Sequence, residues 1–321
     1  MSLENKILSL YRGILFSRYD DRGDLYYFSH TDLDGINKEP YEFKNDKGQA
    51  LRGGFYFTNE KSLDRIVIFA HGLGGGHRSY MREIEQLTRH GYTVLAYDNT
   101  GCMASEGEGA RGFSGSLADL DACIKSLRQI PDYKETQISV VGHSWGAYAT
   151  LNICAYHPDI THICAISGFV SVERMLIQQF SPFLKKYIPM LTALERATNK
   201  DYADSDAITA LHKSRAKALI IHSADDKVVK RKAHFDVLRS ALGQRPSTEL
   251  LLLRGKGHNP NYTPDAVRYE GKCMKDYKRL RKKGKLNTDA EKQSFIAAYD
   301  WHRMTAQDPE VWQRIFDFLD S

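Results

Sequence analysis

The sequence has few of the features that mark disulfide-rich, metal-binding or membrane-spanning proteins. Its 321 residues include five cysteines, an odd number without CxxC pairs or histidine clusters at metal spacing, which argues against a disulfide framework and a structural zinc site. No apolar run approaches the ~20 residues that a membrane span requires. The first sixteen residues interleave charged with apolar positions and lack a small-residue cleavage site, which argues against a secretory signal. We therefore expect a cytoplasmic protein without a transmembrane segment, metal or cofactor.

The charge of the chain is concentrated in one stretch. The composition, 42% hydrophobic and 26% charged, is typical of a soluble globular protein. Of a formal net charge of +5, residues 268–285 alone carry +7, from nine Lys/Arg against two acidic residues. We interpret this stretch as a solvated helical face; contact with nucleic acid or acidic lipid is the alternative. No nucleic-acid-binding motif is present, so no nucleic-acid partner is expected, and the sequence specifies no oligomeric state.

From Arg65 onwards, short buried strands alternate with amphipathic helices. The strands are continuous runs of β-branched residues and leucine, which are typical of a parallel sheet covered on both faces. Such alternation over about 250 residues indicates one doubly wound, mainly parallel α/β domain. The expected strands are 65–71, 93–99, 137–143, 162–168, 217–223 and 249–255, preceded by a hairpin within 41–58. The expected helices are 80–90, 117–129, 145–157, 230–242 and 309–319.

Two long stretches interrupt this alternation. Residues 169–216 are too long for a simple crossover, are rich in apolar residues and predict a helical cap. Residues 260–307 form a second, aromatic and basic insertion. We therefore divide the chain into an N-terminal helical extension (1–40), a core (41–168 and 217–321, with the insertion at 260–307) and the cap (169–216).

The strongest motif is Gly142-His143-Ser144-Trp145-Gly146. It follows an expected strand and opens an expected helix, which is the context of a nucleophile elbow. In such an elbow the flanking glycines permit a tight turn that exposes the serine hydroxyl. The alternative is a glycine-rich turn with an idle serine. We expect Ser144 to be the nucleophile of an acyl-transfer reaction.

A serine hydroxyl needs a base to accept its proton and a third group to orient that base. His258 follows the last core strand in a glycine-rich loop and is the expected base. His222 lies inside an expected strand and His234 inside an expected helix, positions more typical of packed or solvated residues.

The acid should follow the strand 217–223, because the residues of such triads follow the order serine, acid, histidine. Asp225 and Asp226 both stand there. We expect Asp226 to be the triad acid and Asp225 to be a turn or capping residue.

An oxyanion hole must also be present, because its donors have to be fixed before charge develops. The glycine-rich run His71–Gly76 follows the first long strand and can expose backbone N–H groups. We assign the backbone amides of Leu73 and Trp145 to the oxyanion hole. A phosphate-binding loop is disfavoured, since the run lacks G-x-G-x-x-G spacing and a following Lys-Ser/Thr.

Together these motifs resemble the α/β-hydrolase superfamily, near its esterase, monoacylglycerol-lipase-like and serine-aminopeptidase-like branch. The resemblance covers roughly residues 40–258 and the last helix, and it implies the α/β-hydrolase fold with a helical cap. Two departures are Ser223, where the family usually has glycine, and Met103, which replaces the middle glycine of the loop 98–107. The matching segments are His71–Gly74, Asp98–Gly107, Gly142–Gly146, His222–Asp226 and Gly257-His258.

The leading hypothesis is hydrolysis of a carboxylic ester, with a small-molecule acyl substrate, through an acyl-serine intermediate. A peptidase or amidase with the same triad is the nearest rival; it would favour acidic cap residues such as Glu173 or Glu195 to hold a substrate amine. A catalytically idle ligand-binding protein on the same fold is the third hypothesis. The substrate-binding residues are expected to be Phe180, Phe183, Tyr187 and Met103; packing of the cap onto the core is the alternative role for the three aromatic residues.

Overall fold

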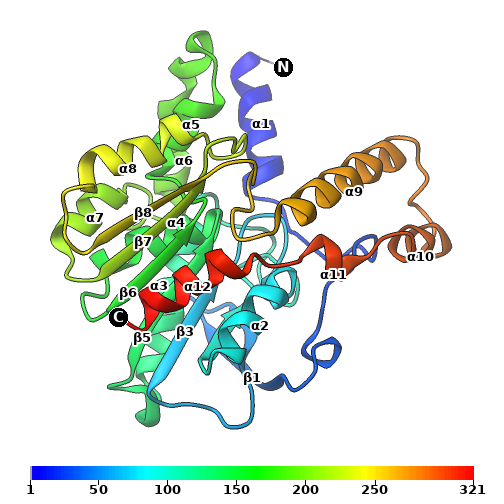
Figure 1. Cartoon of the computed structure of the whole chain (residues 1–321). Coiled ribbons are helices and arrows are strands. Elements are labelled where there is room, and N and C mark those ends of the chain that lie inside the picture. Colours follow the sequence, from blue (N-terminus) through cyan, green and yellow to red (C-terminus); the bar gives the residue numbers. More distant parts are fainter. Residues whose placement is uncertain (1) are drawn as a thin grey trace.

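The computed structural model describes residues 2–321, which are built around one mixed sheet of eight strands (Figure 1). The strand order is β1-β2-β4-β3-β5-β6-β7-β8. The first two strands form a hairpin, β2 pairs antiparallel with β4, and all other neighbours are parallel. The strands are β1 Asn37–Lys44, β2 Ala50–Phe57, β3 Arg65–Ala70, β4 Thr93–Tyr97, β5 Gln137–His143, β6 His162–Ile166, β7 Lys217–Ser223 and β8 Thr248–Leu253.

Helices cover both faces of this sheet. Successive side chains of a strand point to opposite faces, so Ile66 and Ile68 of β3 join one apolar cluster while Val67 and Phe69 join the other. The first cluster packs against α3 (Gly115–Arg128), α4 (Trp145–Asn152) and α8 (Phe235–Leu242). The second packs against α2 (Met81–Arg89) and α12 (Pro309–Leu319). This architecture confirms the predicted doubly wound α/β fold.

Two of the expected helices are shorter than predicted. The helix α4 ends at Asn152 and continues only as a 3-10 turn, Ile153–Ala155; Pro158 disfavours helical geometry at His157, where the predicted helix would have ended. A 3-10 turn, Arg231–Ala233, likewise precedes α8. The last helix has the predicted bounds, and Asp308 caps it by accepting from the amides of Glu310 and Val311.

The stretch predicted as a cap divides into two parts. Helix α5 (Val172–Gln179), the 3-10 helix η5 (Pro182–Tyr187) and helix α6 (Ile188–Thr198) follow the carboxyl end of β6 and project from the sheet (Figure 1). Helix α7 (Ala207–Lys213) instead returns to the core, where it packs against α4 and α8. Only α5–α6 therefore stands above the carboxyl edge of the sheet.

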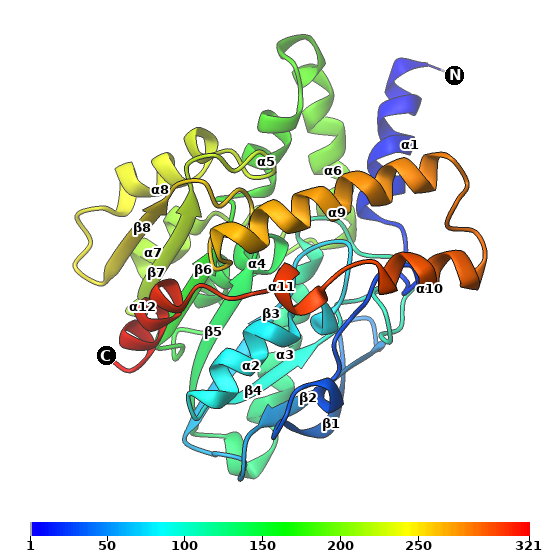
Figure 2. The ribbon, with the colours of Figure 1, turned by 45° about the vertical axis from the view of Figure 1, so that its right-hand side comes forward.

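The second insertion is helical and has a small apolar core of its own. Its helices are α9 (Pro264–Lys282), α10 (Asp289–Ala297) and α11 (Trp301–Met304), and α9 and α10 extend to one side of the sheet (Figure 2). Buried Cys273, Leu286, Phe295 and Met304 form the cluster that holds these helices together.

The N-terminal extension is helical only in its first part, α1 (Leu3–Leu15). Ile7, Tyr11 and Leu15 bury one face of α1, and the Tyr11 hydroxyl donates to Glu195 of α6. Residues 16–36 contain a short 3-10 turn, His30–Asp32, and an isolated β-bridge between Tyr19 and Cys102. No helix within residues 2–321 has the length and apolarity needed to cross a membrane.

Candidate active site

Ser144 lies at a strained turn between β5 and α4. Its φ of 55° and ψ of −111° place it in a region that non-glycine residues rarely adopt. Glycine is required at both flanking positions, because neighbouring atoms lie where a Cβ would be. A Cβ at Gly142 would lie 2.3 Å from Thr150 Oγ1, and one at Gly146 would lie 2.0 Å from the carbonyl oxygen of Ala70. The local sequence therefore holds the serine hydroxyl out of the strand, at the carboxyl edge of the sheet.

A chain of hydrogen bonds joins Ser144, His258 and Asp226. The distance from Ser144 Oγ to His258 Nε2 is 2.9 Å, and that from His258 Nδ1 to Asp226 Oδ2 is 2.8 Å. An ionised carboxylate can only accept, so Nδ1 carries the proton and Nε2 is free to accept from the serine hydroxyl. The structure thus brings together the three residues that the sequence singled out, from three separate loops.

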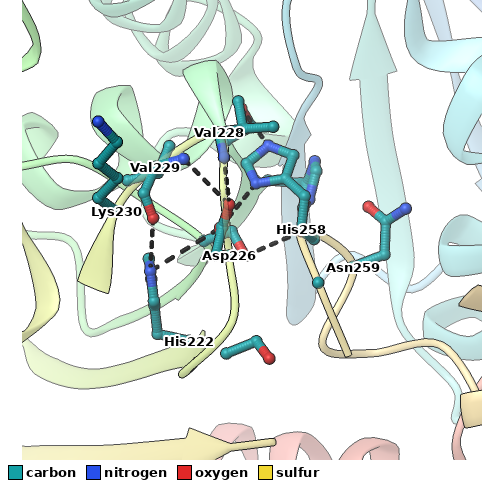
Figure 3. Close-up of polar contacts among 12 residues, drawn as sticks. His222, Asp226, Val228, Val229, Lys230, His258 and Asn259 are labelled. Atoms are coloured by element: carbon teal, nitrogen blue, oxygen red, sulfur yellow. Dashed lines mark hydrogen bonds and ion pairs between the residues drawn. The ribbon is translucent and has the colours of Figure 1, made fainter. Parts of the chain in front are cut away.

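Asp226 is held in its ionised form. Its side chain is fully buried, which by itself would raise its pKa. The hydrogen bond and charge of His258, together with the Val229 amide, outweigh this and lower the pKa of Asp226. Its second oxygen accepts from the amides of Val228 and Val229 at 2.8 and 3.0 Å (Figure 3). A buried carboxylate in this position can orient His258 without taking up its proton.

Asp225 has a different role from its neighbour. Its carboxylate accepts from Ser223 Oγ at 2.6 Å and from the amides of Gly255 and Gly257 at 2.8 and 3.2 Å. These bonds join the loop 224–230 after β7, which we call the acid loop, to the loop that carries His258. Ser223, which departs from the family pattern, is therefore part of the support of these loops.

The two alternative bases lie elsewhere. His222 donates from Nε2 to the carbonyl of Val229 at 2.9 Å and lies 3.8 Å from Asp226, and burial lowers its pKa. His234 accepts from the amide of Val170 through Nδ1. Neither imidazole is hydrogen-bonded to Ser144.

The side chain of His71 holds the loop that follows β3 in place. The His71 side chain is buried, accepts from the Asn99 amide through Nε2 and donates from Nδ1 to the carbonyl of Gly72, both at 2.8 Å. Burial lowers the pKa of His71 and keeps the ring neutral. Leu73 follows in this loop, and Trp145 is the first residue of α4, where a backbone N–H has no acceptor within its own helix.

Tyr80 and His143 link the loop after β3 to the elbow and to the loop that carries His258. Sequence reasoning missed this network. The Tyr80 hydroxyl accepts from the Gly72 amide at 3.1 Å and donates to His143 Nδ1 at 2.9 Å. His143 Nε2 donates to the carbonyl of His258 at 2.9 Å. Burial and the nearby His258 lower the pKa of His143 to about 3, so the ring stays neutral with its proton on Nε2. The only sequence signal was the histidine inside the elbow motif.

The expected pocket residues lie in different environments. Phe180 and Tyr187 are half-buried against the main apolar cluster, and Met103 is half-buried with a φ of 44°. Phe183 is 88% exposed at the tip of the cap, so it does not line an enclosed pocket. Its position between the helices α5 and α6 leaves nothing for the ring to pack against.

A cavity of about 340 Å³ lies beside Leu73, which is one of its lining residues. It is bounded by the loop 72–75, the N-terminal residues 25–28, and Glu270 and Trp301 of the second insertion. Asn259 donates to the Glu270 carboxylate at 2.7 Å, and burial raises the pKa of Glu270. The second insertion, not the cap, walls this cavity.

The two acidic cap residues differ in their surroundings. The carboxylate of Glu195 accepts from Tyr11, from the amides of Phe113 and Ser114 and from the Ser114 hydroxyl. These bonds fasten α1 and α6 to the loop before α3. Glu173 is exposed on α5.

The chain is similar in sequence to known hydrolases over about half of its length. Residues 61–208 match the family model described as serine aminopeptidase, S33. A proline iminopeptidase of Saccharolobus solfataricus is 26% identical over 154 residues, which cover 45% of this chain and 48% of that protein. Cutinase 2 of Thermobifida cellulosilytica is 22% identical over 173 residues, 49% of this chain and 64% of that protein. The chain thus spans about half the length of the curated relatives it matches.

Solved structures share the fold over most of the chain. An esterase of Pyrococcus furiosus superposes with a TM-score of 0.58 at 19% identity, covering 84% of this chain and 96% of that one. A putative dienelactone hydrolase of Klebsiella pneumoniae gives 0.56 at 13% identity, covering 90% and 100%. With its sheet order, its serine at the strand-to-helix turn and these structural similarities, the chain has the α/β-hydrolase fold.

Proposed function

We propose that the protein is a serine hydrolase that cleaves a carboxylic ester through an acyl intermediate on Ser144. The observation that carries the proposal is the continuous hydrogen-bonded chain from Ser144 Oγ through His258 to the buried Asp226 carboxylate. This is the arrangement in which a hydroxyl can be activated at neutral pH.

In the first half of the reaction, His258 Nε2 accepts the Ser144 proton while Oγ attacks the ester carbonyl carbon. The carbonyl oxygen becomes an oxyanion, which the backbone amides of Leu73 and Trp145 stabilise as fixed donors. When this tetrahedral intermediate collapses, the bond to the leaving oxygen breaks. His258 gives its proton to that oxygen, the alcohol departs, and the acyl group stays on Ser144.

In the second half, a water molecule gives a proton to His258 and attacks the acyl carbon. Collapse of the second tetrahedral intermediate breaks the bond to Ser144 Oγ, which recovers its proton, and the carboxylic acid departs. Asp226 stays ionised throughout; it orients His258 and stabilises the imidazolium that forms twice in each turnover.

We assign the acyl pocket to the space between the cap and the elbow, with Phe180, Tyr187 and Met103 as lining residues. Two of these side chains lie in the main apolar cluster beside the cap helices, and sites for acyl groups are lined mainly by such side chains. Phe183 is too exposed to belong to this lining.

A second candidate function is the release of an amino-terminal residue from a peptide or amide. The match to the serine aminopeptidase model favours it, as does the half-buried carboxyl group of Glu270 in the cavity beside Leu73. Such a carboxylate could pair with a substrate ammonium group.

A panel of aryl esters of increasing acyl length, run beside aminoacyl amides of matched size, separates these functions. We expect ester turnover to dominate, with kcat/KM varying with acyl length. Preferential turnover of aminoacyl amides would instead support the peptidase. Absence of turnover on both series would support a catalytically idle binding protein.

A further inference from the structure

Exposed large apolar side chains gather on one side of the molecule. Seven such side chains are exposed within residues 2–321. Six belong to α1, to the cap or to the acid loop, all beside the carboxyl edge of the sheet; the seventh, Leu63, lies in the loop before β3, at the opposite edge. The six are Leu3, Leu10, Ile14, Ile177, Phe183 and Val228.

Three of the six form a stripe on α1. At about 100° per residue, Leu3, Leu10 and Ile14 fall within about 40° of one another around the helix. They are 53%, 67% and 47% exposed. The stripe lies next to the face by which Ile7 and Tyr11 pack against the protein. The apolar surface of α1 is therefore wider than the face that is buried against the core.

The other three extend this surface across the cap. Phe183 at the tip is 88% exposed, and Gln178 of α5 fastens the cap to the acid loop by donating to the carbonyl of Val228 and accepting from the Lys230 amide. The Tyr11–Glu195 hydrogen bond joins α1 to α6. Figures 1 and 2 both show α1 and α5–α6 projecting on the same side, so the two apolar areas belong to one supported surface.

Exposed cations accompany these apolar side chains. They are Lys6, Lys185, Lys186, Lys227 and Lys230, and none forms an ion pair in the part of the chain that the structure describes. The exposed acidic residues on α1, on the stretch from α5 to α6 and on the loop 224–230 are fewer: Glu4, Glu173 and Asp225. Leu63, by contrast, stands among charges of both signs: Glu60 and Asp64 on one hand, and Lys61 and Arg65, both of which form ion pairs, on the other.

We propose that this face, which we call the docking face, binds the surface of a bilayer containing anionic phospholipid. Apolar side chains that enter the headgroup boundary, combined with cations that attract anionic headgroups, are the composition of interfacial membrane-binding elements. Protein interfaces are instead depleted of lysine. Docking in this way would turn the carboxyl edge of the sheet, with Ser144, toward the lipid. The inference does not depend on the proposed esterase activity, because binding is measured without turnover.

The test is co-sedimentation of the full chain with vesicles of phosphatidylcholine, with and without phosphatidylglycerol. We expect binding only to the vesicles that contain phosphatidylglycerol, decreasing as salt is added. Phe183→Ser and Leu10→Ser should each weaken binding about tenfold or more, as expected for one apolar side chain kept in water. Leu63→Ser is the matched control and should bind like the unsubstituted protein.

The electrostatic part is tested in the same way. Lys185→Gln and Lys186→Gln should each weaken binding about fivefold, whereas Lys134→Gln, an exposed lysine before β5 at the opposite edge, should have no effect. Unchanged melting temperatures would show that all variants remain folded, which their exposure leads us to expect.

Three results would overturn the proposal. The first is no binding to anionic vesicles, or equal binding by Phe183→Ser and Leu63→Ser. The second is binding that is lost only with Lys275→Gln and Lys278→Gln, which would move the contact to α9. The third is self-association in the absence of lipid that Phe183→Ser abolishes, which would make a second copy of the chain the occupant of the docking face.

Discussion

The loops that carry the candidate triad differ from the cap above them in how fully they are held in place. Asp226 has every oxygen bonded, Asp225 bridges two loops, and Tyr80 and His143 connect a third. The cap is fastened at its base through Glu195 and Gln178, while its tip exposes Phe183. The difference indicates that fixed geometry is used where bonds are made and broken, and adaptable surface where a substrate or another surface is met.

The largest effect is expected from the two neighbouring aspartates. Asp226→Asn should lower kcat by about 10³–10⁴, because the amide would favour the wrong tautomer of His258. Asp225→Asn should cost much less, since it only weakens the support between two loops. Steady-state kinetics on one aryl ester measures both, and the reverse ranking would move the triad role to Asp225.

The Tyr80–His143 network should have the next largest effect. Tyr80→Phe removes the acceptor of the Gly72 amide and the donor to His143, which loosens the loop that carries Leu73. We expect kcat to fall about 10–100-fold with little change in KM, because small displacements of catalytic groups act mainly on the transition state.

Tyr97→Phe is the control for this substitution. The Tyr97 hydroxyl is buried without a hydrogen-bond partner within residues 2–321, so its removal should leave kcat unchanged. Equal kcat for Tyr80→Phe and Tyr97→Phe would mean that the network does not position the loop.

A smaller and more selective effect is expected from the cap. If Phe180 and Tyr187 line the acyl pocket, Phe180→Ala and Tyr187→Ala should change kcat/KM unequally across acyl lengths, by about 1–3 kcal/mol where a bulky contact is lost. An unchanged acyl-length profile with a lower melting temperature would show that these rings only pack the cap onto the core.

The smallest effect concerns the attachment of the second insertion. Buried Glu83 of α2 accepts from Asn261 Nδ2 at 3.1 Å, and burial raises its pKa to about 7. Between pH about 4.5 and 7 the unfolded chain releases a proton that the folded protein keeps. The free energy of unfolding should therefore fall as the pH rises through this window. Glu83→Gln should flatten the dependence of melting temperature on pH there; a slope equal to that of the unsubstituted protein would contradict the assignment.

Local patterns were enough to predict the sheet and the residues that meet at its edge. Strand–helix alternation depends on short-range periodicity, and the elbow at Gly142–Gly146 requires glycines for reasons that act within a few residues. The place of Asp226, four residues after His222, favours it over Asp225 from the sequence alone. These features are encoded close to where they act.

The remaining features depend on segments far apart in the chain. The contact of Tyr80 with His143 needs three loops to meet, and the cavity beside Leu73 needs the N-terminal residues 25–28 to lie against the second insertion. The exposure of Phe183 depends on how α5 and α6 are stacked. An apolar residue in sequence can line a pocket, pack a helix or face solvent, and only the assembled structure separates these roles.

The central claim is that Ser144 is the acyl-accepting nucleophile activated by His258. The most direct measurement is mass-spectrometric mapping of the adduct formed with a fluorophosphonate, for the unsubstituted protein, Ser144→Ala and His258→Ala. We predict stoichiometric labelling of Ser144 alone, no labelling of Ser144→Ala, and labelling of His258→Ala slowed by several orders of magnitude. Labelling at another residue, or undiminished ester turnover by Ser144→Ala, would contradict the claim.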